Sequence, residues 1–169
     1  MDYLFYLREG PGAAPGPETG LEVEVWRPTL LRPLRAGLPL LPFAAWSAFH
    51  FARVFATRDY RVLLLAGPEG PVHRTCLLPA HFRFPFMVPG DLQAAALWTR
   101  GDLRGRGIAL AGLRAALATV GEHRVWYMVR EDNLPSIRLA EKAGFAFHAR
   151  GGRRRGALAG LLDRFELQA

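Results

Sequence analysis

Two glycines ahead of an amphipathic helix form the clearest candidate binding site in this sequence. The apolar segment 91–99 predicts a strand, and a helix is predicted at about 106–121. Gly105 and Gly107 lie at the junction between the two, where the helix begins. The first N–H groups of a helix lack intrahelical partners, and the helix dipole favours an anion there. Glycine removes the side chains that would hold a phosphate away from the main chain. The pattern therefore predicts a cradle for a pyrophosphate.

Three other phosphate-binding or nucleic-acid-binding patterns fit this segment poorly. A dinucleotide fingerprint needs a third glycine in register, and Leu110 stands at that position. A P-loop ends in Gly-Lys followed by Ser or Thr, whereas the only lysine of the chain is Lys142. An RNA-binding Arg-Gly segment is typical of a disordered tail, but this one lies between a predicted strand and a predicted helix.

Strands and helices must position this segment, and the remaining sequence predicts them from its apolar periodicity. The predicted strands are 3–7, 21–27, 60–66, 72–78, 91–99, 124–130, 145–149 and 157–167, and the predicted helices are 43–57, 106–121 and 133–144. The order strand–helix–strand between 91 and 130 predicts a right-handed crossover between two parallel strands. A chain of 169 residues without a long linker fits one domain.

The segments 104–109 and 133–145 together carry a family resemblance. Arg104-Gly105-Arg106-Gly107-Ile108-Ala109 fits the R/Q-x-x-G-x-G/A signature of the GNAT superfamily of acyl-CoA N-acyltransferases, and 133–145 resembles its second cofactor segment, which ends in Glu-Lys-x-Gly-Phe. The resemblance covers about 93–148. It implies a GNAT-like α/β (α+β) fold, with a mixed, mostly antiparallel twisted sheet of about six or seven strands. Helices would cover both faces, and two parallel central strands would splay apart.

The same resemblance implies how the chain is divided and what it binds. It implies a single N-acetyltransferase domain over 1–169, with N-terminal strands, a helix and an acceptor-side loop in 1–90, the acyl-CoA-binding core in 91–149, and a basic turn and C-terminal strand in 150–169. Acetyl-CoA would be the donor, its pyrophosphate on the main-chain amides of 104–109, and no metal is expected. The implied cofactor-binding residues are Leu97, Trp98, Thr99, Arg104, Gly105, Arg106, Gly107, Ile108, Ala109, Asn133 and Ser136. For Asn133, a helix cap is an equal alternative.

The catalytic groups depart from the family pattern at one position. Many members carry a tyrosine that protonates the departing thiolate where this chain has Ala140. Tyr127, on the neighbouring strand, is the candidate donor, and an ordinary half-buried strand tyrosine is the alternative. The reaction would be direct attack of an amine on the thioester. Asp91 is the first candidate base, with His81, Glu131 and a water chain as alternatives.

The acceptor side carries weaker signals. The aromatic, proline-broken segment 79–90 fits either core packing beneath a loop or the wall of an acceptor pocket. The segment 83–93, with Trp98-Thr99, resembles a subgroup of the superfamily found with surface-glycan biosynthesis. That likeness implies an amino sugar as acceptor, with the basic turn 150–155 either meeting the phosphates of a nucleotide-linked form or lying in solvent.

Charge leaves other functions open. The 22 Lys and Arg residues exceed the 15 Asp and Glu residues, which gives a formal net charge of +7 and a pI of about 10.7. This suggests anionic partners, but a compositional bias toward arginine is the alternative explanation, and charge alone does not identify a ligand. A non-catalytic acyl-CoA-binding module would explain Ala140, and a nucleic-acid-binding domain would explain the charge. We expect an acetyltransferase that acts on primary amines of small molecules and does not bind nucleic acid. A homodimer is one open possibility for its oligomeric state.

The location of the protein follows from two further features. Cys76 is the only cysteine, so no intrachain disulfide is possible. The N-terminus lacks the pattern of a signal peptide, and the apolar stretch 38–56 is interrupted by Pro39, Pro42, His50 and Arg53. We therefore expect a cytoplasmic protein without a membrane span.

Overall fold

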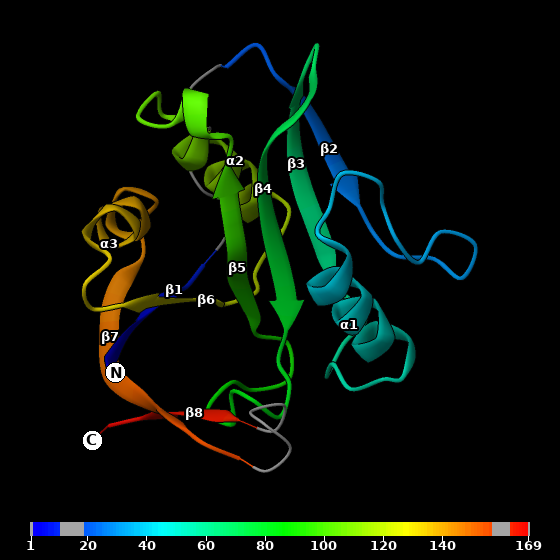
Figure 1. Cartoon of the computed structure of the whole chain (residues 1–169). Helices are drawn as coiled ribbons and strands as arrows, with labels where there is room; N and C mark the ends of the chain where they lie inside the picture. The colour runs from blue at the N-terminus through cyan, green and yellow to red at the C-terminus, as the bar shows by residue number, and fades with distance from the viewer. Residues whose placement is uncertain (1, 11–18, 157–162, 169) are drawn as a thin grey trace.

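One eight-stranded sheet organises the computed structural model, which describes residues 2–10, 19–156 and 163–168 (Figure 1). The strands are β1 (Asp2–Arg8), β2 (Glu22–Trp26), β3 (Arg61–Gly67), β4 (Gly70–Pro79), β5 (Leu92–Thr99), β6 (Val125–Arg130), β7 (Ala146–Arg154) and β8 (Arg164–Leu167). Their order in the sheet is β2-β3-β4-β5-β6-β1-β7-β8. Only β5 and β6 are parallel neighbours among these described strands.

The predicted fold class is confirmed, with eight strands in place of six or seven. Both edge strands, β2 and β8, are short but pair with their neighbours. Pairing with β8 also extends β7 to Arg154, so most of the predicted basic turn 150–155 is strand. Residues 157–162 of the expected last strand lie outside the described residues.

Helices cover both faces of the sheet. They are α1 (Leu40–Phe51), α2 (Ile108–Ala118) and α3 (Leu134–Lys142), with a 3₁₀ turn, η1 (Gly101–Leu103), before α2. Successive side chains of a strand point to opposite faces. Accordingly, Leu63 and Leu65 of β3 pack in one core cluster with α2 and α3, whereas Val62 and Leu64 pack in a second cluster with α1. Within the described ranges, no helix is long and apolar enough to cross a membrane.

The two parallel strands separate soon after they begin. Among the described residues, the pairs between β5 and β6 are Leu92 with Val125, Gln93 with Trp126 and Ala94 with Tyr127. Beyond them the strands diverge, as Figure 1 shows. Ala96 has a φ of 49°, and the register between β4 and β5 shifts between Arg74 and Cys76. A bulge of this kind bends its strand, so the splay expected from the family resemblance opens at Ala94 and Tyr127.

Candidate active site between α2 and α3

A cleft of about 640 Å³ lies between the first turn of α2 and one face of α3, where β5 ends. The predicted cofactor-binding residues that line it are Leu97, Trp98, Thr99, Arg104, Gly105, Gly107, Ile108, Ala109, Asn133 and Ser136. Arg106 is the exception: its side chain is exposed and lies outside the lining. The structure thus brings together segments that are about thirty residues apart in the sequence.

The loop into α2 leaves main-chain donors available at the cleft. Gly105 and Gly107 have φ values of 76° and 78°, in the left-handed region that favours glycine. Gly107 is the N-cap of α2 and, among the described residues, no side chain caps this end of the helix. The first N–H groups of α2 therefore remain without intrahelical partners, and they favour an anion.

Three basic side chains line the same cleft, and no acidic residue of the described chain does. Arg104 also donates from Nε to the carbonyl oxygen of Thr99 at 3.3 Å, which ties the loop to the end of β5. Arg138 and Lys142 were missed by the sequence reasoning, which stopped at the family motifs. Their signal was the spacing of four residues, which places both on one face of α3. Together these groups make the cleft favourable for a phosphorylated ligand.

A buried histidine, His73, forms a hydrogen bond with the last residue of β5, Thr99. His73 is fully buried, with Nδ1 2.8 Å from Thr99 Oγ1 and Nε2 2.8 Å from Thr75 Oγ1. Burial and, to a smaller degree, the charge of Arg74 lower the pKa of His73 to about 4, so the ring is neutral at neutral pH. Gly112 of α2 lies directly over the ring. His73 therefore connects β4, β5 and α2 beneath the mouth of the cleft.

We expect Gly112→Ala to destabilise the protein although alanine favours helices. A Cβ at position 112 would lie 2.1 Å from Cδ2 and 2.5 Å from Nε2 of His73, which is held on both sides by threonines. The helix or the ring must shift, at a cost of about 1–3 kcal/mol. Chemical denaturation measures this loss. At Gly152 no described atom lies within 4 Å of an added Cβ, so Gly152→Ala is the control, and an equal loss in both variants would contradict the prediction.

The second cofactor segment also has the expected local structure. Asn133 caps α3, because its Oδ1 accepts a hydrogen bond from the backbone N–H of Ser136 at 3.2 Å. Tyr127 lies at the last paired position before the splay and lines the cleft. Burial raises the pKa of Tyr127 above its ordinary value, and a side-chain hydrogen bond with Ser136 offsets part of that rise. The phenol is therefore protonated at neutral pH, while Ala140 is fully buried in the core.

Asp91, the first candidate base, lies outside the lining of this cleft. It precedes β5, and only 2% of it is exposed. Its carboxylate accepts two hydrogen bonds of 2.9 Å from Arg124, one of 2.8 Å from Trp126 Nε1 and one of 3.1 Å from the backbone N–H of Val88. The structure does not bring Asp91 to the cleft, and its contacts connect the starts of β5 and β6 with the loop before them.

The two alternative bases lie in different surroundings. Glu131 forms a 2.7 Å ion pair with Arg150, a residue of the predicted basic turn. His81 lines a second cavity on the opposite face of the sheet. The aromatic segment 79–90 contributes to this cavity as well as to a core cluster that contains Phe84 and Met87. The segment therefore packs in the core and also lines a cavity.

Comparisons with known proteins agree with this geometry. Residues 78–145 match the Acetyltransferase (GNAT) family. A GCN5-related N-acetyltransferase from Sphaerobacter thermophilus matches over 88% of this chain and 49% of its own, with 19% identity and a TM-score of 0.52. A putative acetyltransferase from the GNAT family, from Novosphingobium aromaticivorans DSM 12444, matches over 88% of this chain and 60% of its own, with 17% identity and a TM-score of 0.54. A GCN5-related N-acetyltransferase from Kribbella flavida matches over 89% of this chain and 56% of its own, with 13% identity and a TM-score of 0.54.

The chain spans half to three fifths of the length of these three solved structures. Because the sequence identities are low, the structural likeness shows a shared fold and no more. No curated protein matches the sequence. The family match runs from the end of β4 through the loop, α2, β6 and α3 to the start of β7, and so contains the whole lining of the cleft. The family match covers about two fifths of the chain, and with the shared fold it makes residues 78–145 similar to the acetyl-CoA-type transferases of the GNAT family.

Proposed function

We propose that this protein is an N-acetyltransferase that uses acetyl-CoA as donor and the primary amine of a small molecule as acceptor. The observation that carries the proposal is the cleft between α2 and α3, in which an uncapped helix N-terminus, three cationic side chains and the end of a splayed strand converge. The amides of 104–109 would bind the pyrophosphate, and Arg104, Arg138 and Lys142 would add charge.

The splay gives the donor a route to the acceptor. Beyond Ala94, β5 no longer pairs with β6 among the described residues, so its main chain is free on that side to bond the amides of a pantetheine arm. An arm laid along β5 from the loop at 104–109 directs the thioester toward Ala94 and Tyr127. Asn133 and Ser136 flank that path from α3.

The chain supplies positioning and one acidic proton. A neutral amine attacks the thioester carbonyl carbon, a C–N bond forms, the C–S bond breaks, and the surplus proton of the amine leaves to a base or to water. Tyr127 gives its phenolic proton to the departing thiolate, since its raised pKa keeps it protonated and it lies where the splay begins. We take 1–169 as one such domain, with acceptor-side elements in 1–90, the acyl-CoA core in 91–149 and the terminal strand region in 150–169.

Two measurements test the proposal together. Calorimetric titration with acetyl-CoA should show saturable binding, and a thiol reagent should detect free CoA when a panel of primary amines is added. Binding without release for any amine would instead support the alternative of a non-catalytic acyl-CoA-binding module. Absence of acetyl-CoA binding would overturn both.

We expect Tyr127→Phe to lower kcat by about 100-fold, the usual size of a general-acid contribution, with little change in acetyl-CoA affinity. Tyr6→Phe is the matched control, because Tyr6 is the cross-strand partner of Tyr127, is equally buried, and donates its hydroxyl to Glu141 at 3.4 Å outside the cleft lining. Rates are measured as CoA release under saturating donor. Equal effects of the two substitutions would remove Tyr127 as the donor.

A further inference from the structure

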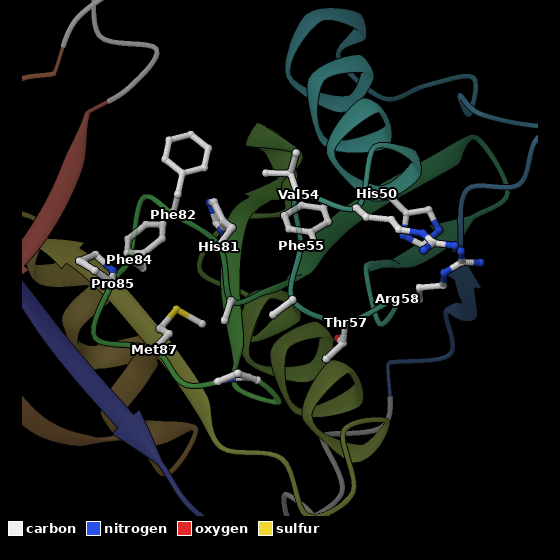
Figure 2. Close-up of a pocket in the computed structure, with 14 residues that line it drawn as sticks. His50, Val54, Phe55, Thr57, Arg58, His81, Phe82, Phe84, Pro85 and Met87 are labelled. Carbon is white, nitrogen blue, oxygen red and sulfur yellow. The ribbon is translucent and has the colours of Figure 1, made fainter.

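A second cavity of about 640 Å³ lies on the sheet face opposite α2 and α3 (Figure 2). It runs between the segment from the end of α1 to β3 and the segment between β4 and β5. Its lining residues are His50, Arg53, Val54, Phe55, Ala56, Thr57, Arg58, Ala80, His81, Phe82, Phe84, Pro85, Met87 and Pro89. This volume is that of a small-molecule site.

One end of the cavity is cationic. Figure 2 shows His50 and Arg58 close together at this end. Within the part of the chain that the structure describes, Arg53 and Arg58 have no ion-pair partner, and no Asp or Glu lines the cavity. The Nδ1 atom of His50 is buried without a hydrogen-bond partner among the described residues. Unpaired guanidinium groups favour carboxylate or phosphate oxygens.

The other end is aromatic and surrounds a histidine. The ring of His81 lies 5.4 Å from that of Phe55 and 5.2 Å from that of Phe84, measured between centroids. Figure 2 shows His81 between Phe55 on one side and Phe82 and Phe84 on the other. Rings in this arrangement provide apolar surface for a flat or aliphatic body.

His81 also offers a hydrogen-bond acceptor to the cavity. Its Nδ1 lies 3.0 Å from the carbonyl oxygen of Pro79, which only accepts, so Nδ1 carries the proton. Burial lowers the pKa of His81, the hydrogen bond with Pro79 offsets part of that decrease, and the charge of Arg83 adds a smaller decrease, so the ring is neutral at neutral pH. A neutral ring protonated on Nδ1 has a lone pair on Nε2, which accepts an N–H hydrogen bond.

The aromatic end of the cavity is the one beside the splay. Phe84 and Met87 share a core cluster with Trp126, which pairs with Gln93, one residue before the strands separate. Arg58 precedes β3, which lies two strands from β5 in the sheet. A ligand that spans the cavity therefore has one end near the expected thioester and the other end at the arginines.

We propose that this cavity binds the acceptor, and that the acceptor is a primary amine whose apolar or aromatic body ends in a carboxylate or phosphate. The anionic group binds Arg53 and Arg58, the body packs on Phe55 and Phe84, and the amine donates to Nε2 of His81. An amino sugar without an anionic group would leave the arginines without an anionic partner and the aromatic rings without apolar contact. The inference rests on the proposed transferase activity, because it assigns the acceptor of that reaction.

The test compares two amines of one shape, 4-(aminomethyl)benzoate and 4-(aminomethyl)benzamide, with glucosamine as a third substrate. We expect kcat/KM for CoA release to be about tenfold higher for the benzoate than for the benzamide, because a charge-assisted hydrogen bond is worth about that factor. In Arg53→Met and Arg58→Met this preference should disappear, mainly through a higher KM for the benzoate. Arg32→Met, which removes an exposed arginine outside the cavity, should keep it.

The outcomes separate this inference from the proposed function. Acetyl-CoA binding with equal use of benzoate and benzamide, or better use of glucosamine, would overturn the acceptor class and leave the transferase standing. If acetyl-CoA binds but no amine is acetylated, calorimetric titration with the two aryl amines decides. Tighter binding of the benzoate, lost in Arg58→Met, then supports the inference, and its absence overturns it. Failure of acetyl-CoA itself to bind would overturn the proposed function.

Discussion

Asp91→Ala is expected to lower the free energy of unfolding by about 3 kcal/mol, because it leaves buried donors without their acceptor. The carboxylate of Asp91 accepts from Trp126 Nε1, from the backbone N–H of Val88 and twice from Arg124. Denaturation in urea measures the change. Asp132→Ala is the control, because Asp132 pairs with Arg130 at the surface, where an ion pair contributes about 0–1 kcal/mol. Equal losses would show that Asp91 is not held as the structure describes.

The same variant separates a structural role from the catalytic one expected from the sequence. At a temperature where the variant remains folded, acetyl-CoA affinity and kcat should be close to those of the wild type, since Asp91 does not line the cleft. A large loss of kcat with unchanged stability would restore Asp91 as the base.

The local structure of the cleft could be predicted because its determinants are local. Glycines at 105 and 107 permit positive φ, a helix begins directly after them, and Asn133 caps the next helix, so each feature depends on neighbouring residues. The parallel pair β5–β6 follows from the strand–helix–strand order in the same way. Even Arg138 and Lys142 were accessible from their spacing on α3.

The remaining features depend on contacts that are remote in sequence. The role of Asp91 is set by Arg124 and Trp126, more than thirty residues away, and an isolated aspartate before a strand gives no sign of them. The insertion of β1 between β6 and β7 is likewise a long-range pairing. The second cavity needs the segments 50–58 and 80–89 to meet, and the aromatic composition of the latter segment did not separate core packing from a pocket wall.

Gly107→Trp is expected to weaken acetyl-CoA binding by about 100-fold, since lost hydrogen bonds to a charged phosphate are worth about 3 kcal/mol. No described atom lies within 4 Å of a Cβ at this position, so the protein has room for the side chain, but the φ of 78° disfavours any L-residue. The indole would occupy space over the first turn of α2, where the cradle requires close approach of the phosphates. Calorimetric titration measures the dissociation constant.

Gly121→Trp separates this effect from backbone strain and bulk. Gly121 follows the C-terminal end of α2, has a φ of 60°, and has no described atom within 4 Å of an added Cβ. Both substitutions impose comparable strain on the ends of one helix, but only position 107 lies in the cleft. Loss of stability in both variants with loss of affinity in Gly107→Trp alone supports the cradle. Unchanged affinity in a folded Gly107→Trp protein would move the pyrophosphate site away from α2.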